Sequence, residues 1–208
     1  HKAGMRGVVG ESLIDFPTAS FNNLAAGIAL SERLINKWQG DYLIRPSICA
    51  HAPYTCSAET LKQAKALADK HNTILQIHLS ETSKEVEDIQ ARTGMRPAEY
   101  LNSLGLLDSN VIAAHCVWLN PEEIDLLAKT GTSISHCPKS NLKLSSGIAP
   151  VDACLQAGIT VGIGTDGTAS NNTLDMVEEM RFAALLAKIV DYNPEAVNAK
   201  TALRMATI

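Results

Sequence analysis

Short apolar runs alternate with longer amphipathic stretches along the chain. The apolar runs are rich in Val and Ile, which is typical of strands that are buried on both faces of a sheet. We therefore predict strands at Met5–Ile14, Leu43–Ala50, Thr73–His78, Val111–His115, Thr132–His136 and Ile159–Gly164.

The stretches between these runs repeat apolar residues at helical spacing. Ser57 is a good N-cap for one of them, and Asn120 followed by Pro121 is a typical helix start. A break is expected near Gly94 and Pro97. The predicted helices are Leu24–Trp38, Ala58–His71, Lys84–Leu104, Pro121–Lys129, Ile148–Ala157 and Leu174–Val190, with a last helix from Pro194.

Repeated strand–helix units of this kind predict an α/β fold with a parallel sheet. Six units are two fewer than a closed eight-stranded barrel needs. The alternative is an open doubly wound sheet, which usually has a glycine-rich phosphate loop after its first strand. Here the first predicted strand runs into Gly-Glu-Ser-Leu without that loop. We therefore expect residues 1–208 to form one incomplete TIM-like barrel domain.

Composition and charge narrow the range of partners. The 208 residues are 46% hydrophobic and 19% charged, with a net charge of −4 and no cluster of Lys or Arg. This pattern does not favour a nucleic-acid partner or a membrane surface, and no apolar run reaches the ~20 residues that span a bilayer. The five cysteines have no metal-binding spacing, which indicates reduced thiols in a cytoplasmic protein.

Three of the predicted strands end in a histidine, and a fourth runs into an aspartate. These residues are His78, His115, His136 and Asp166, and His51 follows another strand. The carboxyl ends of parallel barrel strands share one mouth, so these side chains should converge. Imidazole and carboxylate groups are ligands for a catalytic zinc- or iron-type metal. One histidine alone would be read as structural.

Glu81 lies three residues after His78, just beyond a strand end. One interpretation is an acidic residue that opens a helix, where negative charge is favoured. The other is a group that moves protons, because metal-dependent hydrolysis at a C–N bond must protonate the leaving nitrogen. The spacing alone does not separate the two.

Several motifs resemble those of the amidohydrolase superfamily. They are His-Leu-Ser-Glu, Ala-His-Cys-Val, Ser-His-Cys-Pro-Lys-Ser-Asn-Leu-Lys-Leu and Gly-Thr-Asp-Gly-Thr-Ala-Ser-Asn-Asn, in that order, together with HAPYTCS, SNLKLSSGIAPV and TALRMAT. Within that superfamily they are similar to the branch of methylthioadenosine and S-adenosylhomocysteine deaminases and triazine hydrolases. The resemblance runs from Gly4 to the last residue.

The resemblance implies roles for individual residues. His78 and Asp166 would be metal ligands, and Asp166 would also take a proton from the attacking water. Glu81 would carry that proton to the substrate, and His115 would orient the water and stabilise developing charge. His51 and Ser170 would line the substrate pocket, with Glu81 also contacting substrate. His136 and Asn141 would shape the loop after their strand.

Two features differ from the family's pattern. The family's first strand carries a His-x-His pair that completes the metal site, and this sequence has no such pair. We therefore expect a chain that starts at the third barrel strand, lacks the first strands and a small β-domain, and binds metal weakly. Some relatives that handle S-adenosylhomocysteine have an arginine after the third strand, where Glu11 stands here. This favours an uncharged substrate.

The leading hypothesis is a hydrolytic deaminase of adenosine- or methylthioadenosine-type nucleosides, or of a related amino-heterocycle, in the full-length parent. It would use one divalent metal, with zinc expected and iron or manganese as alternatives, and a small-molecule substrate. It is expected to bind neither nucleic acid nor membrane, and it could form a homo-oligomer. The alternatives are a triazine-type chlorohydrolase and a non-catalytic barrel fragment.

Overall fold

The structure is a computed structural model that describes residue 4 and residues 6–207. It has a parallel sheet of six strands in the order β2-β4-β5-β6-β7-β8 and a two-stranded sheet of β1 and β3. The strands are β1 (Gly7–Val9), β2 (Ser12–Leu13), β3 (Ile44–Pro46), β4 (Ile48–Ala50), β5 (Leu75–Leu79), β6 (Val111–His115), β7 (Ser133–His136) and β8 (Val161–Ile163).

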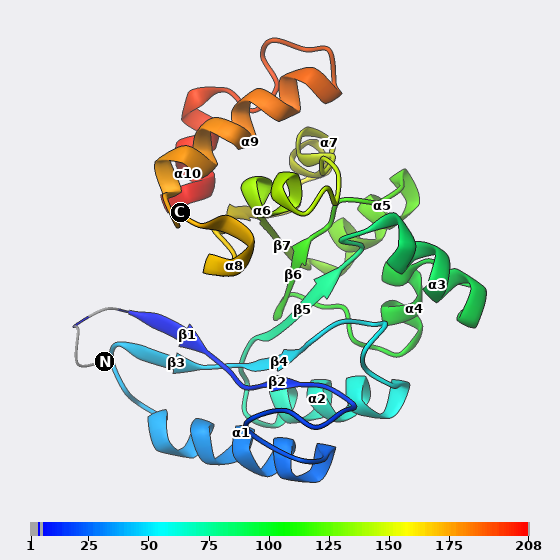
Figure 1. The fold of residues 1–208 in the computed structure, drawn as a ribbon, viewed down its shortest axis with the longest axis vertical. Coiled ribbons are helices and arrows are strands. Elements are labelled where there is room, and N and C mark those ends of the chain that lie inside the picture. The colour runs from blue at the N-terminus through cyan, green and yellow to red at the C-terminus, as the bar shows by residue number, and fades with distance from the viewer. Residues whose placement is uncertain (1–3, 5, 208) are drawn as a thin grey trace.

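Helices follow the strands and cover the outer face of the sheet (Figure 1). They are α1 (Leu24–Trp38), α2 (Ala58–Lys70), α3 (Ser83–Thr93), α4 (Pro97–Ser103), α5 (Pro121–Thr130), α6 (Pro138–Lys143), α7 (Val151–Gln156), α8 (Thr168–Asn171), α9 (Met176–Val190) and α10 (Ala199–Thr207). Along the larger sheet the strands follow one another in chain order, and every strand pair is parallel. The predicted α/β fold with a partial barrel is confirmed.

The first two predicted strands are each broken in two, which the apolar pattern did not indicate. The break lies at Gly10 in the first strand and at Ser47 in the second, so that β1 and β3 form a separate pair. At this point the two strand segments approach closely, because a Cβ on Gly10 would lie 2.6 Å from the carbonyl oxygen of Ser47. Met5, where the first strand was predicted to begin, lies outside the described residues.

Most helix predictions hold, with corrections at the ends. The stretch Lys84–Leu104 breaks as expected, because Gly94 ends α3 in a left-handed conformation and Pro97 opens α4. The helix predicted from Ile148 begins only after Pro150. The last helix does not start at Pro194 but after Asn198, whose side chain accepts a hydrogen bond from the amide of Thr201. The short helices α6 and α8 were not predicted.

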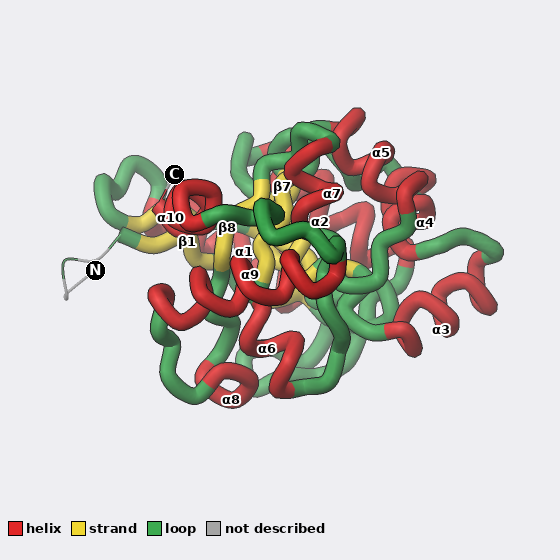
Figure 2. Tube along the Cα trace, turned by 90° about the horizontal axis from the view of Figure 1, so that it is seen from above, coloured by secondary structure: helices red, strands yellow, loops and turns green. Residues whose placement is uncertain are grey.

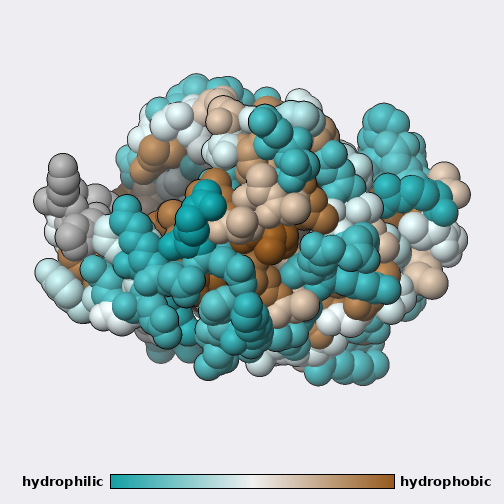
Figure 3. Space-filling model, turned by 90° about the horizontal axis from the view of Figure 1, so that it is seen from below, coloured by the Kyte–Doolittle hydropathy of each residue, from teal (hydrophilic) through white to brown (hydrophobic). Residues whose placement is uncertain are grey.

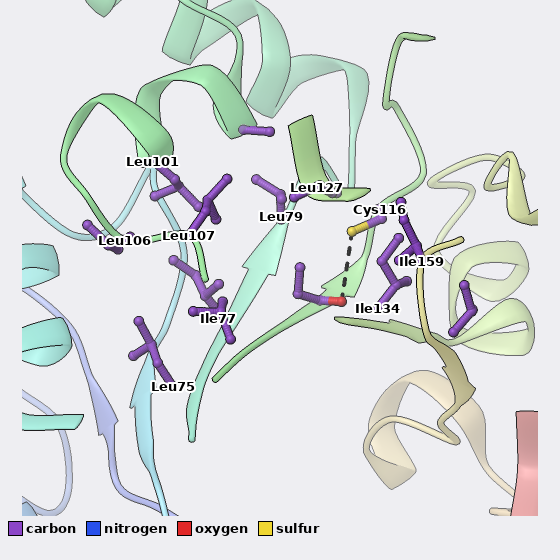
Figure 4. Close-up of a cluster of buried hydrophobic side chains, with 14 of the residues drawn as sticks. Leu75, Ile77, Leu79, Leu101, Leu106, Leu107, Cys116, Leu127, Ile134 and Ile159 are labelled. Atoms are coloured by element: carbon purple, nitrogen blue, oxygen red, sulfur yellow. Dashed lines mark hydrogen bonds between the residues drawn. The ribbon is translucent and has the colours of Figure 1, made fainter. Parts of the chain in front are cut away.

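The hydrophobic core lies between the sheet and the outer helices. Along β5, Leu75, Ile77 and Leu79 are buried on the helix side, and Gln76 and His78 point to the opposite, concave face. Figure 4 shows these leucine and isoleucine side chains packed with residues from α4, α5 and the neighbouring strands. The thiol of Cys116 donates to the carbonyl of Ala113 within this core. The core therefore holds the strand ends in fixed positions.

The strands of the larger sheet lie near the centre of the molecule and β1 lies at one side, with α3, α4 and α5 along the opposite flank (Figure 2). On the face shown in Figure 3, hydrophobic side chains gather near the middle and hydrophilic ones surround them. Such a mixture is ordinary for a domain surface.

None of the helices in the described part of the chain has the length and apolar character required to span a bilayer.

Candidate active site

Three histidines form a row across the carboxyl ends of β4, β5 and β6. The ring centroids of His51 and His78 are 5.0 Å apart, and those of His78 and His115 are 5.3 Å apart in a stacked arrangement. The sheet register explains this row, because His78 lies beside Ala114 and Leu79 lies beside His115. The structure thus brings together side chains that are 64 positions apart in the sequence, from 51 to 115.

The backbone fixes the orientation of His78. Its Nδ1 lies 2.6 Å from the carbonyl oxygen of His51, so this nitrogen carries the proton and donates it. The Nε2 atom is therefore the ring nitrogen that remains available to a ligand. Metal-binding histidines commonly use one ring nitrogen in this way while the other binds the metal.

Glu81 lies next to His115, with 3.8 Å between its Oε2 and the Nε2 of the imidazole. Its other carboxylate oxygen lies 3.5 Å from the hydroxyl of Ser146, at the limit of a hydrogen bond. Thr82 is the N-cap of α3, so Glu81 precedes the helix and does not lie in its first turn. The side chain is partly buried and faces the histidine row.

His115 ends β6 and has an unusual backbone conformation. Its φ of 71° lies in the left-handed region, and the ring is 2% exposed. The Nδ1 atom lies 2.8 Å from Oδ1 of Asn141 and donates to it. This contact assigns a proton to Nδ1 and leaves Nε2 on the side of Glu81.

Asp166 follows β8 and is the centre of a second set of hydrogen bonds. The hydroxyls of Ser140 and Ser170 donate to Oδ2 at 2.6 and 2.7 Å, and the amide of Gly167 donates to Oδ1 at 2.7 Å. Partial burial acts to raise the pKa of Asp166, but these hydrogen bonds outweigh it and hold the pKa below its ordinary value. Asp166 is therefore an ionised carboxylate in a fixed orientation.

The short helix α6 connects the two parts of the site. Its adjacent residues Ser140 and Asn141 hold Asp166 and His115 respectively. Lys139 anchors the helix to Thr173 and Glu178, beside the start of α9. The sequence motifs did not indicate a role for Ser140. The proline after Cys137 is a usual helix-start signal, and it could have located this helix.

The other two histidines near the mouth have different environments. His136 is 2% exposed, its Nδ1 has no hydrogen-bond partner in the described structure, and burial lowers its pKa to about 3. It is therefore a neutral, buried group behind the site. Partial burial and the adjacent His78 lower the pKa of His51, whose Nδ1 lies 2.8 Å from the hydroxyl of Thr55.

A cavity of about 260 Å³ lies on the concave face of the sheet, with His78 in its wall. Gln76, Ala114 and Ser135 line it from neighbouring strands. The space beside His78 is therefore open to a small ion or molecule, whereas the opposite face of β5 is filled by core side chains.

The metal ligands named by the sequence do not form a complete site by themselves. In residue 4 and residues 6–207, no group of three or more His, Cys, Asp or Glu side chains is placed to hold a metal ion. His78 and Asp166 nevertheless have the chemistry of ligands, since one offers a free imidazole nitrogen and the other an ionised carboxylate. They fit a zinc site to which other ligands are added.

Comparison with known proteins places this chain in a family. The chain belongs to the amidohydrolase family, whose model matches residues 1–208. It is 47% identical over 207 residues to a 5-methylthioadenosine/S-adenosylhomocysteine deaminase of Thermodesulfovibrio yellowstonii, covering 100% of this chain and 47% of that protein. The chain thus spans about half the length of the curated relatives that it matches.

Solved structures agree with the fold. An adenosine deaminase from Xanthomonas campestris with bound zinc superposes with a TM-score of 0.97 at 43% identity, over 99% of this chain and 47% of that one. An atrazine chlorohydrolase from Arthrobacter aurescens, complexed with zinc, gives a TM-score of 0.91 at 26% identity, over 99% and 48% of the two chains. Both reactions proposed from the sequence therefore occur among proteins similar to this chain.

Proposed function

We propose that the protein containing this chain is a metal-dependent deaminase that hydrolyses the exocyclic C–NH2 bond of an adenosine- or methylthioadenosine-type nucleoside. The observation that carries the proposal is the position of Glu81, a carboxylate facing the Nε2 of His115 beside the histidine row. The relatives named as deaminases of such nucleosides support the substrate class.

Zinc is the proposed metal, with iron or manganese as alternatives, and His78 and Asp166 would be two of its ligands. When bound, a divalent ion of this kind lowers the pKa of water so that it can attack the ring at neutral pH. The free Nε2 of His78 and the ionised carboxylate of Asp166 suit this role. The zinc described in the similar adenosine deaminase supports the choice of metal.

The chain's own residues would move the protons. Asp166, held by two hydroxyls and an amide, would accept a proton from the attacking water. Glu81 would carry the protons that the attacking water loses to the ring nitrogen and to the leaving amine, which departs as ammonia. His115, fixed by Asn141, would orient the water through Nε2 and stabilise the charge that develops on it.

The substrate would lie against the mouth formed by these strand ends. His51, neutral because its pKa is lowered, and Ser170 would contact it, together with Glu81. Glu11, on the loop between β1 and β2, offers no cation for a substrate carboxylate. This supports an uncharged nucleoside over one with an amino-acid tail.

Chloride displacement is the second candidate, supported by the similar atrazine chlorohydrolase. An amine must be protonated as it leaves, whereas chloride leaves as an anion. Glu81 beside His115 supplies the group that deamination requires. The higher identity to deaminases, 47% against 26%, favours the same choice.

Two further features of the proposal concern the cell and the assembly. All five cysteines are free thiols in the structure, which supports the expectation of a reducing compartment such as the cytoplasm. A homo-oligomer remains a prediction.

The test is Glu81→Gln in the full-length protein, with Glu87→Gln as the control, because Glu87 is exposed on α3. Ammonia release from adenosine and methylthioadenosine should fall by about two or more orders of magnitude in the first variant only. Zinc content should be equal in all three proteins. Near-normal turnover of Glu81→Gln would refute the proton-transfer role, and release of chloride from a chlorotriazine without deamination would favour the second candidate.

A separate measurement addresses the metal. A catalytic zinc site normally has about three protein ligands, and the described residues offer no such group. The 208-residue chain alone should therefore retain far less than one zinc per molecule after dialysis. Stoichiometric zinc would show that our ligand assignment is wrong.

A further inference from the structure

Glu85, four residues beyond Glu81, is a buried carboxylate that the proposed reaction does not use. Its side chain is 3% exposed. Oε1 accepts a hydrogen bond from the amide of Ser80 at 2.9 Å, and Oε2 accepts one from the amide of Glu81 at 2.8 Å. Both carboxylate oxygens are therefore used to bind the turn that carries Glu81.

This arrangement differs from an ordinary helix cap. Glu85 is the third residue of α3, and Thr82 at the N-cap accepts a hydrogen bond from its amide. In a capping box the glutamate would bind the amide of the N-cap residue in return. Glu99 in α4 and Glu123 in α5 do so, with the amides of Arg96 and Asn120.

Glu85 reaches past Thr82 instead, to the two preceding amides. A cap would not need this longer reach, because the amide of Thr82 is nearer in the chain. The contact therefore acts on the turn between β5 and α3. That turn needs support, since Ser80 has a left-handed φ of 50° and is fully buried.

The rest of the turn is held from the opposite side. The amide of Trp118 donates to the carbonyl of Ser80 at 2.9 Å, and the indole of Trp118 donates to the carbonyl of Ser146. Ser146 in turn lies beside the carboxylate of Glu81. Glu85 thus adds a second set of hydrogen bonds to the turn between β5 and α3, which the segment after β6 already holds through Trp118.

We propose that Glu85 is a positioning residue that fixes the backbone of Ser80 and Glu81, so that the Glu81 carboxylate stays directed at His115. This rests on the function proposed above. Misplacement by about 1 Å far from the chemistry can lower a rate by about 100-fold. Loss of Glu85 should therefore lower turnover while metal binding and substrate affinity are largely retained.

The structural arm of the test measures amide hydrogen exchange in the chain itself. In the wild type, the amides of Ser80 and Glu81 should be protected although neither belongs to a helix or strand. Glu85→Gln places an NH2 group against one of these donors, so their exchange should accelerate by about tenfold or more. Ile77 in β5 should be unaffected, and so should all amides of the control Glu87→Gln.

The functional arm uses the full-length holoenzyme and adenosine. Glu85→Gln should lower kcat by about 10- to 100-fold, with KM within about threefold and zinc content unchanged. Glu87→Gln should match the wild type. A merely structural role in stability would change neither kcat nor KM for the fraction of enzyme that is folded.

The outcomes separate the two proposals. If Glu81→Gln retains turnover, the proposed function fails, and the exchange rates still decide whether Glu85 holds the turn. If Glu81→Gln is inactive but Glu85→Gln keeps normal kcat, the positioning role is refuted alone. If Glu85→Gln does not fold, the wild type still provides a test. Rapid exchange of its Ser80 and Glu81 amides would refute the positioning role of Glu85.

Discussion

Replacement of Glu85 by glutamine should change how the stability of the chain depends on pH. Burial is the largest influence on this carboxyl and raises its pKa from 4.5 to about 7, against the lowering effect of the amides of Glu81 and Ser80. Glu81 also repels it, and the titratable groups Tyr54 and Cys116 lie within its electrostatic reach.

The sign follows from proton binding. Between about pH 4.5 and 7 the folded protein holds a proton on Glu85 that the unfolded chain has lost, so the free energy of unfolding falls as the pH rises. Below this window Glu85 is protonated in both states, so its ionisation does not affect stability. Above the window Glu85 is ionised in both states, and the full free-energy cost of burying the charged carboxylate lowers the stability of the folded protein. At about 1.4 kcal/mol per pH unit, the difference amounts to about 3 kcal/mol.

Urea unfolding of the wild type and Glu85→Gln from about pH 4 to 8 would measure this effect. Other carboxyls titrate in both proteins, so the difference between the two curves isolates Glu85. The wild type should lose about 3 kcal/mol relative to the variant across the window. A difference that stays constant within about 0.5 kcal/mol would refute the assignment. Glu87→Gln should follow the wild-type profile.

Two substitutions and one NMR titration test the structure elsewhere. Asn141→Leu should remove the acceptor for the Nδ1 proton of His115, and ¹⁵N NMR should show a mixed tautomer, whereas an unchanged Nδ1–H form would contradict the contact. Glu123→Ala removes a fully buried carboxylate that pairs with the partly exposed Arg96 and accepts from the buried amide of Ala98, and it should cost about 1–3 kcal/mol in urea unfolding, against less than about 0.5 for exposed Glu122→Ala. The ring protons of His136 should not shift between about pH 5 and 8, since burial lowers its pKa to about 3.

The sequence was informative where the chain is buried on both faces. The runs that became β5, β6 and β7 are short, apolar and bounded by polar residues, so their carboxyl ends could be located at His78, His115 and His136. From parallel strands it follows that these ends share one edge. The approach of His78 to His115 was therefore predictable before any coordinates, whereas His136 is buried behind this row.

The supporting contacts were not predictable in the same way. α6 has six residues, too few for a helical period to be recognised. Glu85 looks like an acidic residue in the first turn of a helix, a position where such residues are favoured for their charge alone. Its actual partners depend on the path of the turn at Ser80, which is set by the neighbouring strand.

The placement of α6 has a consequence for protein engineering. The helix follows β7, which lies between β6 and β8 in the sheet. Successive helical residues point about 100° apart, and this divergence lets Ser140 reach toward β8 while Asn141 reaches toward β6. An insertion or deletion here would rotate both contacts away at once. Libraries intended to change substrate preference should therefore keep the length of this segment and vary other loops.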